Sequence, residues 1–147
     1  MRKKNHLLVI RFTTIDDVAE LAPLVKAVAV RYPDIRITVL SRDNARKLFN
    51  DLAPNVNFME ANLKEDYHGI KGLNALYRRL VAKQFTHVAD MQSVIRSLFL
   101  RLRFNLGRFR VEHISKKQTK KKEGAPVPTL TDRYIEVFTR LGFPIDQ

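Results

Sequence analysis

Two adjacent acidic residues near the start of the chain, Asp16 and Asp17, are the first candidates for chemistry. They follow a short apolar segment and two threonines, and a helical pattern begins after them. Ligands of open α/β sheets bind beyond the carboxyl ends of the strands, so a carboxylate at this turn could act as a general base. The spacing from Thr14 to Asp17 also fits a capping box, and Asp16 fits a solvent-exposed acid of the first helical turn. Spacing alone favours the cap over the base for Asp17 and leaves both roles open.

A second polar segment, ADMQSVIRS, follows another apolar stretch later in the chain. Asp90 ends a predicted strand there, and Gln92 and Arg96 come shortly after it. Because the carboxyl ends of parallel strands meet at one edge of a sheet, these side chains could line the crevice opposite Asp17. Taken alone, Asp90 is more simply a cap of the next helix and Arg96 a solvated surface residue.

Several kinds of site are not expected from the composition. The chain has no cysteine, which excludes disulfides, thiolate metal sites and cysteine nucleophiles. Its four histidines are scattered without the spacing of metal ligands. No glycine occurs before Gly69, whereas dinucleotide-binding and phosphate-binding turns need glycine for close backbone approach. We therefore expect no metal, no bound cofactor and no nucleotide held by the first turn.

Positive charge dominates the chain, whose formal net charge is +12. Nine Lys/Arg and one acid lie between residues 101 and 122, and charge at that density attracts polyanions such as nucleic acid, anionic lipid or phosphorylated glycans. The charge alone does not distinguish among these ligands. The lysines that we predict to bind an anionic ligand are Lys116, Lys117, Lys120, Lys121 and Lys122.

The elements that must position these residues alternate along the chain. Apolar patterns predict strands at 7–12, 35–40, 56–59, 86–90 and 109–114, and helices at 17–31, 43–52, 70–83, 94–104 and 131–141. Strands that alternate with helices pair in parallel through right-handed crossovers. The predicted fold is an α/β, Rossmann-like parallel sheet with helices on both faces. We expect a single domain of residues 1–147, in which 115–129 form a basic, proline-containing loop.

The hydropathy pattern bears on the location of the protein. No apolar run approaches the roughly 20 residues that span a bilayer. The basic start MRKKNH precedes an apolar run that is too short for the core of a signal peptide. We therefore expect a soluble, cytoplasmic protein.

Four segments together resemble a known family. VIRFTTIDDVAELAPLVKAV, followed by YPDIRITVLSR, looks like the start of lipopolysaccharide heptosyltransferases and their relatives in glycosyltransferase family 9. VADMQSVIRS resembles the later D-x-Q-x-x-x-R-S segment of that family, and TDRYIEVFTRLGFPID resembles the helix before its interdomain linker. The resemblance implies the N-terminal, acceptor-binding half of a GT-B glycosyltransferase. The nucleotide-sugar domain of such an enzyme is C-terminal, and we expect it to be absent from this chain.

The resemblance also implies roles for individual residues. Asp17 falls on the proposed catalytic base of an inverting, metal-independent sugar transfer, which takes the proton from the acceptor hydroxyl. The residues that fall on the acceptor-facing segments are Arg11, Thr13, Thr14, Asp90, Gln92 and Arg96. Asp16 departs from the family pattern, which usually has glycine at that position.

The implied acceptor is a phosphorylated, lipid-linked oligosaccharide of the lipopolysaccharide core. Such an anionic glycolipid, together with the basic segment, implies peripheral contact with the inner membrane. The nucleotide-sugar donor would be bound only through the C-terminal domain. We therefore expect this chain to bind acceptor and to transfer no sugar alone, which leaves open whether it is an enzyme by itself.

Two other functions would each explain part of the sequence. A basic nucleic-acid-binding α/β module would explain the net charge, but the sequence contains no recognition motif and the charge concentrates in a predicted loop. A response-regulator-like signalling domain would explain acids at the ends of two strands, but we find no convincing lysine opposite them. The glycosyltransferase interpretation is therefore preferred, with the nucleic-acid module as the alternative.

Overall fold

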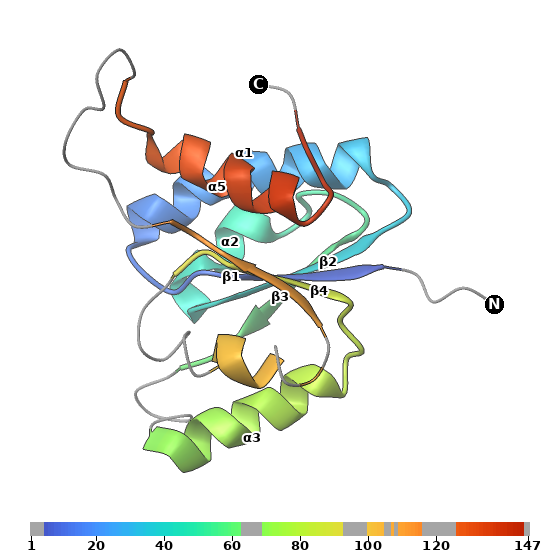
Figure 1. The fold of residues 1–147 in the computed structure, drawn as a ribbon, viewed down its shortest axis with the longest axis vertical. Coiled ribbons are helices and arrows are strands. Elements are labelled where there is room, and N and C mark those ends of the chain that lie inside the picture. Colours follow the sequence, from blue (N-terminus) through green and yellow to red (C-terminus); the bar gives the residue numbers. More distant parts are fainter. Residues whose placement is uncertain are drawn as a thin grey trace.

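A computed structural model describes residues 5–62, 69–92, 100–104, 107, 109–115 and 126–145 of the chain. Five parallel strands form one sheet in the order β3-β2-β1-β4-β5 (Figure 1). Their bounds are β1 His6–Ile10, β2 Arg36–Ser41, β3 Val56–Glu60, β4 His87–Asp90 and β5 Arg110–His113. The chain moves outward from β1 to β3 and then returns to β4 on the other side of β1. The strand order therefore reverses between β1 and β4, the place where sheets of this kind bind ligands.

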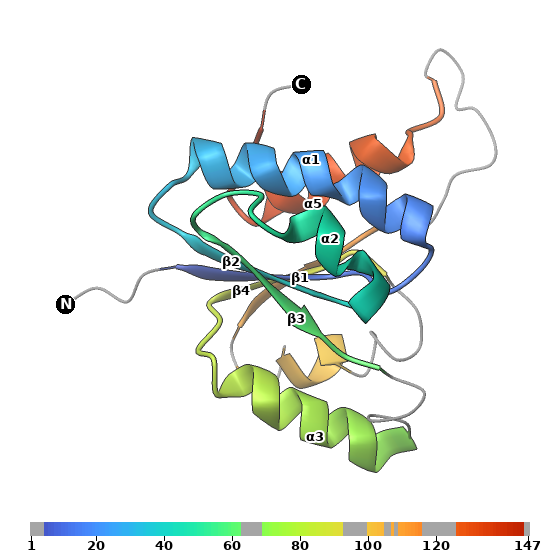
Figure 2. The same cartoon turned by 180° about the vertical axis from the view of Figure 1, so that it is seen from behind.

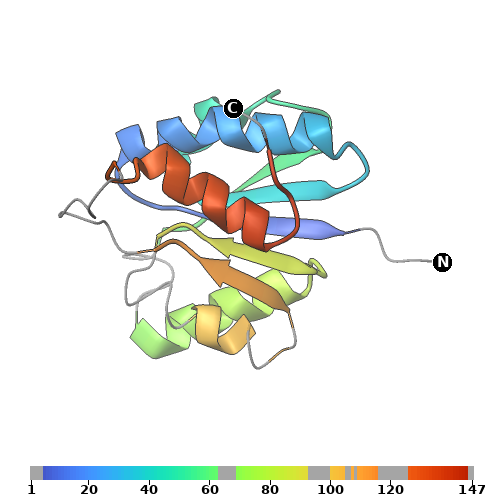
Figure 3. The ribbon, with the colours of Figure 1, turned by 45° about the horizontal axis from the view of Figure 1, so that its top comes forward.

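Helices cover both faces of the sheet, as the sequence predicted. One face carries α1 (Ile15–Arg31), α5 (Leu130–Arg140) and the short α2 (Arg46–Phe49), which follows the 3-10 turn η1 (Asp43–Ala45). The other face carries α3 (Gly69–Val81) and the helical residues 100–104 (Figures 1 and 2). Seen from above, α1 and α5 lie side by side over the strands (Figure 3). Among the described residues, every helix falls short of the length and apolar character that a membrane span requires.

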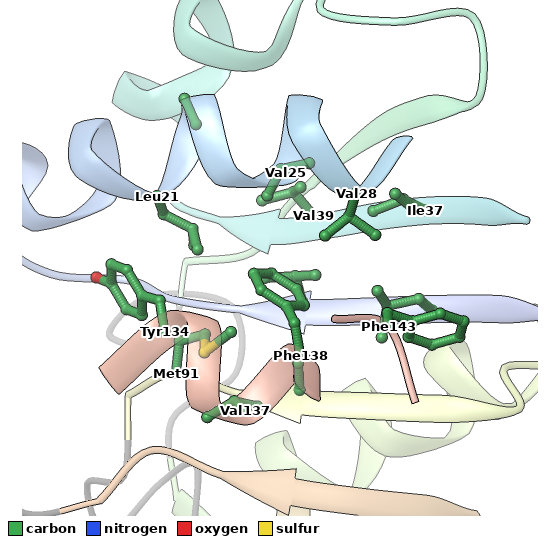
Figure 4. Packing of buried hydrophobic residues seen from close by; sticks show 14 of the residues in the cluster. Leu21, Val25, Val28, Ile37, Val39, Met91, Tyr134, Val137, Phe138 and Phe143 are labelled. Carbon is green, nitrogen blue, oxygen red and sulfur yellow. The ribbon is translucent and has the colours of Figure 1, made fainter. Parts of the chain in front are cut away.

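The larger core lies between the sheet and the pair α1 and α5 (Figure 4). Leu21, Val25 and Val28 form one stripe of α1 that faces the core. Val25 and Val28 lie beside the β2 side chains of Val39 and Ile37. A stripe at three- and four-residue spacing lies on one side of a helix, which is why this sequence packs one face of α1 inward. A second apolar cluster lies between the other face of the sheet and α3.

The predicted element boundaries hold closely, with one exception. The helix α1 ends at Arg31, just before Tyr32 and Pro33, as expected for a helix that precedes proline. The helix predicted over 43–52 is shorter, because a 3-10 turn opens it and α2 ends at Phe49. Asp51 has a φ of 55°, a left-handed conformation that cannot continue a helix. Of the predicted helix 94–104, only 100–104 lie among the described residues, and they are helical.

Candidate active site

Arg11 follows β1 directly and contacts predicted site residues in and after the turn that leads to α1. Its Nε donates to the carbonyl oxygen of Thr13 at 2.6 Å, and its Nη1 donates to the carbonyl oxygen of Met91, which follows β4. Its Nη2 lies 3.0 Å from Oδ2 of Asp17 and forms an ion pair with it. The Asp17 side chain is 39% exposed, and no described residue donates a hydrogen bond to its Oδ1. One carboxylate oxygen is thus fixed by a cation, while the other is available to a ligand.

The chain contains a second Thr-x-x-Asp segment that shows what a complete cap looks like. Before α5, Thr129 accepts from the N–H of Asp132, and the Asp132 carboxylate accepts from the N–H of Thr129, both at 3.0 Å. Before α1, Thr14 accepts from the N–H of Asp17 at 3.4 Å, and no reciprocal bond from the Thr14 N–H occurs between these two described residues. The Asp17 carboxylate pairs with Arg11 instead. The same local pattern therefore serves as a full capping box in one helix and as a partial one in the other.

Gln92 connects the end of β4 to the first turn. Its Oε1 accepts from the backbone N–H groups of Phe12 and Thr13 at 2.8 and 3.0 Å. Its Nε2 donates to Oγ1 of Thr13 at 3.1 Å. These bonds link residues about 80 positions apart in sequence and use most of the hydrogen-bonding capacity of the amide. Gln92 therefore fixes the conformation of the turn that carries Asp17.

Asp90 is fully buried at the end of β4, opposite Ile10 of β1. Its Oδ1 accepts from the backbone N–H of Gln92 at 3.1 Å, and its Oδ2 lies 4.0 Å from Nη1 of Arg101. A buried carboxylate needs such partners, because removing a charge from water is costly. The Asp90 carboxylate thus holds the backbone of Gln92 and fixes the segment that follows β4.

Tyr134 of α5 was missed by sequence reasoning. Its hydroxyl donates to the backbone carbonyl of Asp17 at 2.8 Å, and burial raises the pKa of this hydroxyl to about 12. The Tyr134 side chain lies on the side of α5 that faces α1 (Figure 4). Nearby, Thr131 donates to Glu20 of α1 at 2.8 Å. The C-terminal helix therefore fixes the first turn of α1, and the neutral Tyr134 hydroxyl keeps its proton for that bond.

A hollow of about 520 Å³ lies at the carboxyl ends of β2 and β3, on the same edge of the sheet. Sequence reasoning missed it as well. Its lining includes two cationic residues, Arg42 and Arg79, together with Asn44, Glu60 and Asn62. Only the position of Arg42 just after a predicted strand could have indicated it, since Arg79 comes from α3 on a distant part of the chain.

The structure brings together Arg11, Thr13, Thr14, Asp17, Asp90 and Gln92. Asp16 is exposed in the first turn of α1. The remaining predicted residues, which are Arg96, Lys116, Lys117, Lys120, Lys121 and Lys122, lie outside the described residues. Within the described part of the chain, no group of His, Asp or Glu side chains could hold a metal ion.

Comparison with solved structures places this geometry in a known fold. A glycosyl transferase family 9 protein from Veillonella parvula matches 97% of this chain with a TM-score of 0.70 and 19% identity, over 43% of its own length. The E. coli heptosyltransferase WaaC with ADP-2-deoxy-2-fluoro heptose matches 97% of this chain with a TM-score of 0.65 and 17% identity, over 50% of its own length. These matches cover the N-terminal half of the heptosyltransferases. The chain has the fold of one half of a GT-B glycosyltransferase.

The same fold also occurs in proteins of another activity. A structure of a putative UDP-N-acetylglucosamine 2-epimerase from Listeria monocytogenes matches 94% of this chain with a TM-score of 0.58 and 15% identity, over 37% of its own length. The chain thus spans half or less of the length of each of these three structures. No protein-family model matches the sequence, and a search of curated proteins found no match. The fold alone therefore does not determine what the chain does.

Proposed function

We propose that this chain is the acceptor-binding half of an inverting, heptosyltransferase-like glycosyltransferase. The observation that carries the proposal is the arrangement of Asp17, whose carboxylate pairs with Arg11 instead of completing the helix cap. A residue needed only as a cap would have the bonding pattern of Asp132. The match of the fold to heptosyltransferase structures supports the proposal without deciding it.

In the proposed mechanism, Asp17 is the general base. Arg11 holds Oδ2, so Oδ1 accepts the proton of the acceptor hydroxyl as that oxygen attacks the anomeric carbon of the nucleotide-sugar. The oxygen forms the new glycosidic bond while the nucleotide leaves from the opposite side, which inverts the configuration. Gln92, held in turn by Asp90, keeps the turn in a fixed position for this step. The reaction requires no metal and no cofactor.

The proposed acceptor is an anionic glycolipid, a phosphorylated core oligosaccharide of lipopolysaccharide. Arg96 and the lysines of 116–122 are assigned to its phosphate groups. Each basic residue near an anionic membrane contributes about 1 kcal/mol, which favours peripheral contact with the cytoplasmic side of the inner membrane. The nucleotide-sugar would be held by a separate donor domain, so we propose that residues 1–147 bind acceptor but do not catalyse transfer.

Binding measurements on the whole chain test this function. The phosphorylated core glycolipid and duplex DNA are compared as ligands at low and at moderate salt. We expect saturable binding of the glycolipid, weakened by about tenfold or more in Arg11→Gln, because the turn loses charge-assisted hydrogen bonds. Arg31→Gln at the other end of α1 removes the same charge and should bind like the unaltered chain.

Three outcomes would contradict the proposal or a part of it. Tighter binding of DNA than of the glycolipid, with a steep dependence on salt, would favour the nucleic-acid module. Equal losses in Arg11→Gln and Arg31→Gln would show that only overall charge matters. Sugar transfer by residues 1–147 alone would contradict the assignment of the donor site to another domain.

A further inference from the structure

The amino-terminal edge of the sheet, opposite the candidate active site, carries a second hollow of about 540 Å³. On the α3 side of the sheet, Leu8 of β1, Leu40 of β2 and Met59 of β3 belong to the apolar cluster. Side chains two positions away along a strand point to the same face. The corresponding positions toward the amino ends are the polar residues His6, Thr38 and Asn57, which line the hollow.

Two cations flank this row of polar residues. Arg36 begins β2 next to His6, and Lys83 follows α3. Both line the hollow together with Gln84, and no acidic residue is among the described residues that line it. Neither cation forms an ion pair within the part of the chain that the structure describes. The hollow therefore has the positive potential and the hydrogen-bonding groups that an anion requires.

The hydrogen bonds of His6 determine where its proton lies. Nδ1 is 3.1 Å from the carbonyl oxygen of Lys83, which can only accept, so Nδ1 carries the hydrogen. Nε2 is 2.8 Å from Oγ1 of Thr38, so in the neutral ring Nε2 accepts from the Thr38 hydroxyl. Once Nε2 is protonated, it donates to Thr38 instead. The hydroxyl hydrogen of Thr38 is then released from His6 and can be donated to a ligand in the hollow.

We propose that this hollow binds a small phosphorylated molecule, whose phosphate pairs with Arg36 and Lys83. Arg36 offers a planar fork of donors and Lys83 a point charge, a combination suited to phosphate. The volume of the hollow lies within the range of about 300–1,000 Å³ that is typical of small-molecule sites. The site is separate from the proposed acceptor site, because it lies at the opposite ends of the strands.

Binding at this site is linked to pH through His6. Burial lowers the pKa of His6, the hydrogen bond to the Lys83 carbonyl opposes that shift, and the charges of Arg36 and Lys83 lower the pKa further. Among the described residues, the side chains of Phe85 and Thr38 also contact the ring, and both are uncharged. A bound anion offsets the two cations and therefore raises the pKa of His6. By linkage, binding tightens as the pH falls through that pKa.

The test follows the ring protons of the four histidines by NMR in the whole chain. At pH 7.5, glucose 6-phosphate should shift the His6 resonance saturably, and glucose should not. Sulfate, which stays doubly charged between pH 5 and 8, should raise the pKa of His6. The absence of a saturable shift with glucose 6-phosphate, or an unchanged pKa with sulfate, would overturn the proposal.

Paired variants separate a local site from general charge. Arg36→Gln combined with Lys83→Gln should weaken glucose 6-phosphate binding by about tenfold or more, through loss of charge-assisted hydrogen bonds. Lys26→Gln combined with Lys47→Gln removes the same charge from exposed positions outside the hollow and should leave binding unchanged. Equal weakening in the two double variants would overturn the proposal. The His6 resonance without ligand reports whether each variant is folded.

Discussion

The two Thr-x-x-Asp segments predict different costs for the same substitution. At Thr129, both reciprocal bonds are made at 3.0 Å, so Thr129→Ala removes a full cap and should destabilise the chain by about 1 kcal/mol. At Thr14, one long bond of 3.4 Å is present, so Thr14→Ala should cost about 0.5 kcal/mol or less. Both threonines are exposed, which means that lost burial does not confuse the comparison.

Urea unfolding of the whole chain, followed by circular dichroism at pH 7.5, measures the difference between the two variants. A change of 1 kcal/mol corresponds to about 2–4 °C in Tm for a chain of this size, so thermal unfolding provides a second measurement. Asp132→Asn weakens a cap bond and Asp17→Asn removes an ion pair that is 39% exposed at the carboxylate. We expect the second change to cost little, because exposed ion pairs contribute about 0–1 kcal/mol.

One result would refute this reasoning. If Thr14→Ala destabilised the chain as much as Thr129→Ala, the start of α1 would depend on its cap as strongly as α5 does. The partial cap before α1 would then be as effective as a full one, and its contrast with α5 would give no reason to assign the Asp17 carboxylate a catalytic role. A smaller cost at Thr14 is the result expected of a partial cap, in which the Asp17 carboxylate pairs with Arg11 and makes no bond to the Thr14 N–H.

Three further predictions follow from the described contacts. Burial lowers the pKa of His6 and His87 below the ordinary value of 6.5, so near that pH the unfolded chain binds more protons than the folded chain. Urea titrations should therefore show a lower free energy of unfolding at pH 5 than at pH 7.5. The decrease should be smaller after both histidines are changed to asparagine. Phe138→Ala in the larger core should cost about 3–5 kcal/mol in the same assay, and a cost below 1 would contradict the packing. Gly142→Ala should destabilise the chain by about 1 kcal/mol. Gly142 has a φ of 96°, which strains the backbone of any residue with a Cβ, although the added Cβ would clash with no neighbouring atom. A neutral result would contradict the positive-φ conformation that follows α5.

The arrangement of strands and helices could be predicted because it depends on local patterns. Alternation of apolar strands with amphipathic helices implies a parallel sheet, and the strand order reverses between β1 and β4 as the fold requires. The helix after β2 was predicted too long, since the pattern does not show that Asp51 adopts a positive φ. Backbone conformation at a single non-glycine residue is set by its surroundings, which periodicity does not report.

The contacts of the candidate site could be predicted only in part. The sequence predicted that Gln92 could line the crevice opposite Asp17, and the structure brings Gln92 into contact with the turn before Asp17. It could not show that Tyr134, 117 residues from Asp17, donates to its carbonyl group. Nor could it show the polar row at the opposite edge, because the pairing of Thr38 with Asn57 depends on the register of β2 and β3.

The difference between the two Thr-x-x-Asp segments shows which information decides the role of Asp17. Locally the two segments are equivalent, since each has threonine before a helix and aspartate in its third position. The difference is Arg11, which follows β1. Its hydrogen bond to the carbonyl oxygen of Met91, which follows β4, holds its side chain in place. That bond requires the sheet to be assembled, so the orientation of the Asp17 carboxylate depends on the tertiary fold. A cap depends on its own helix alone, and for this reason the dependence of Asp17 on the neighbouring strands supports a role at the edge of the sheet.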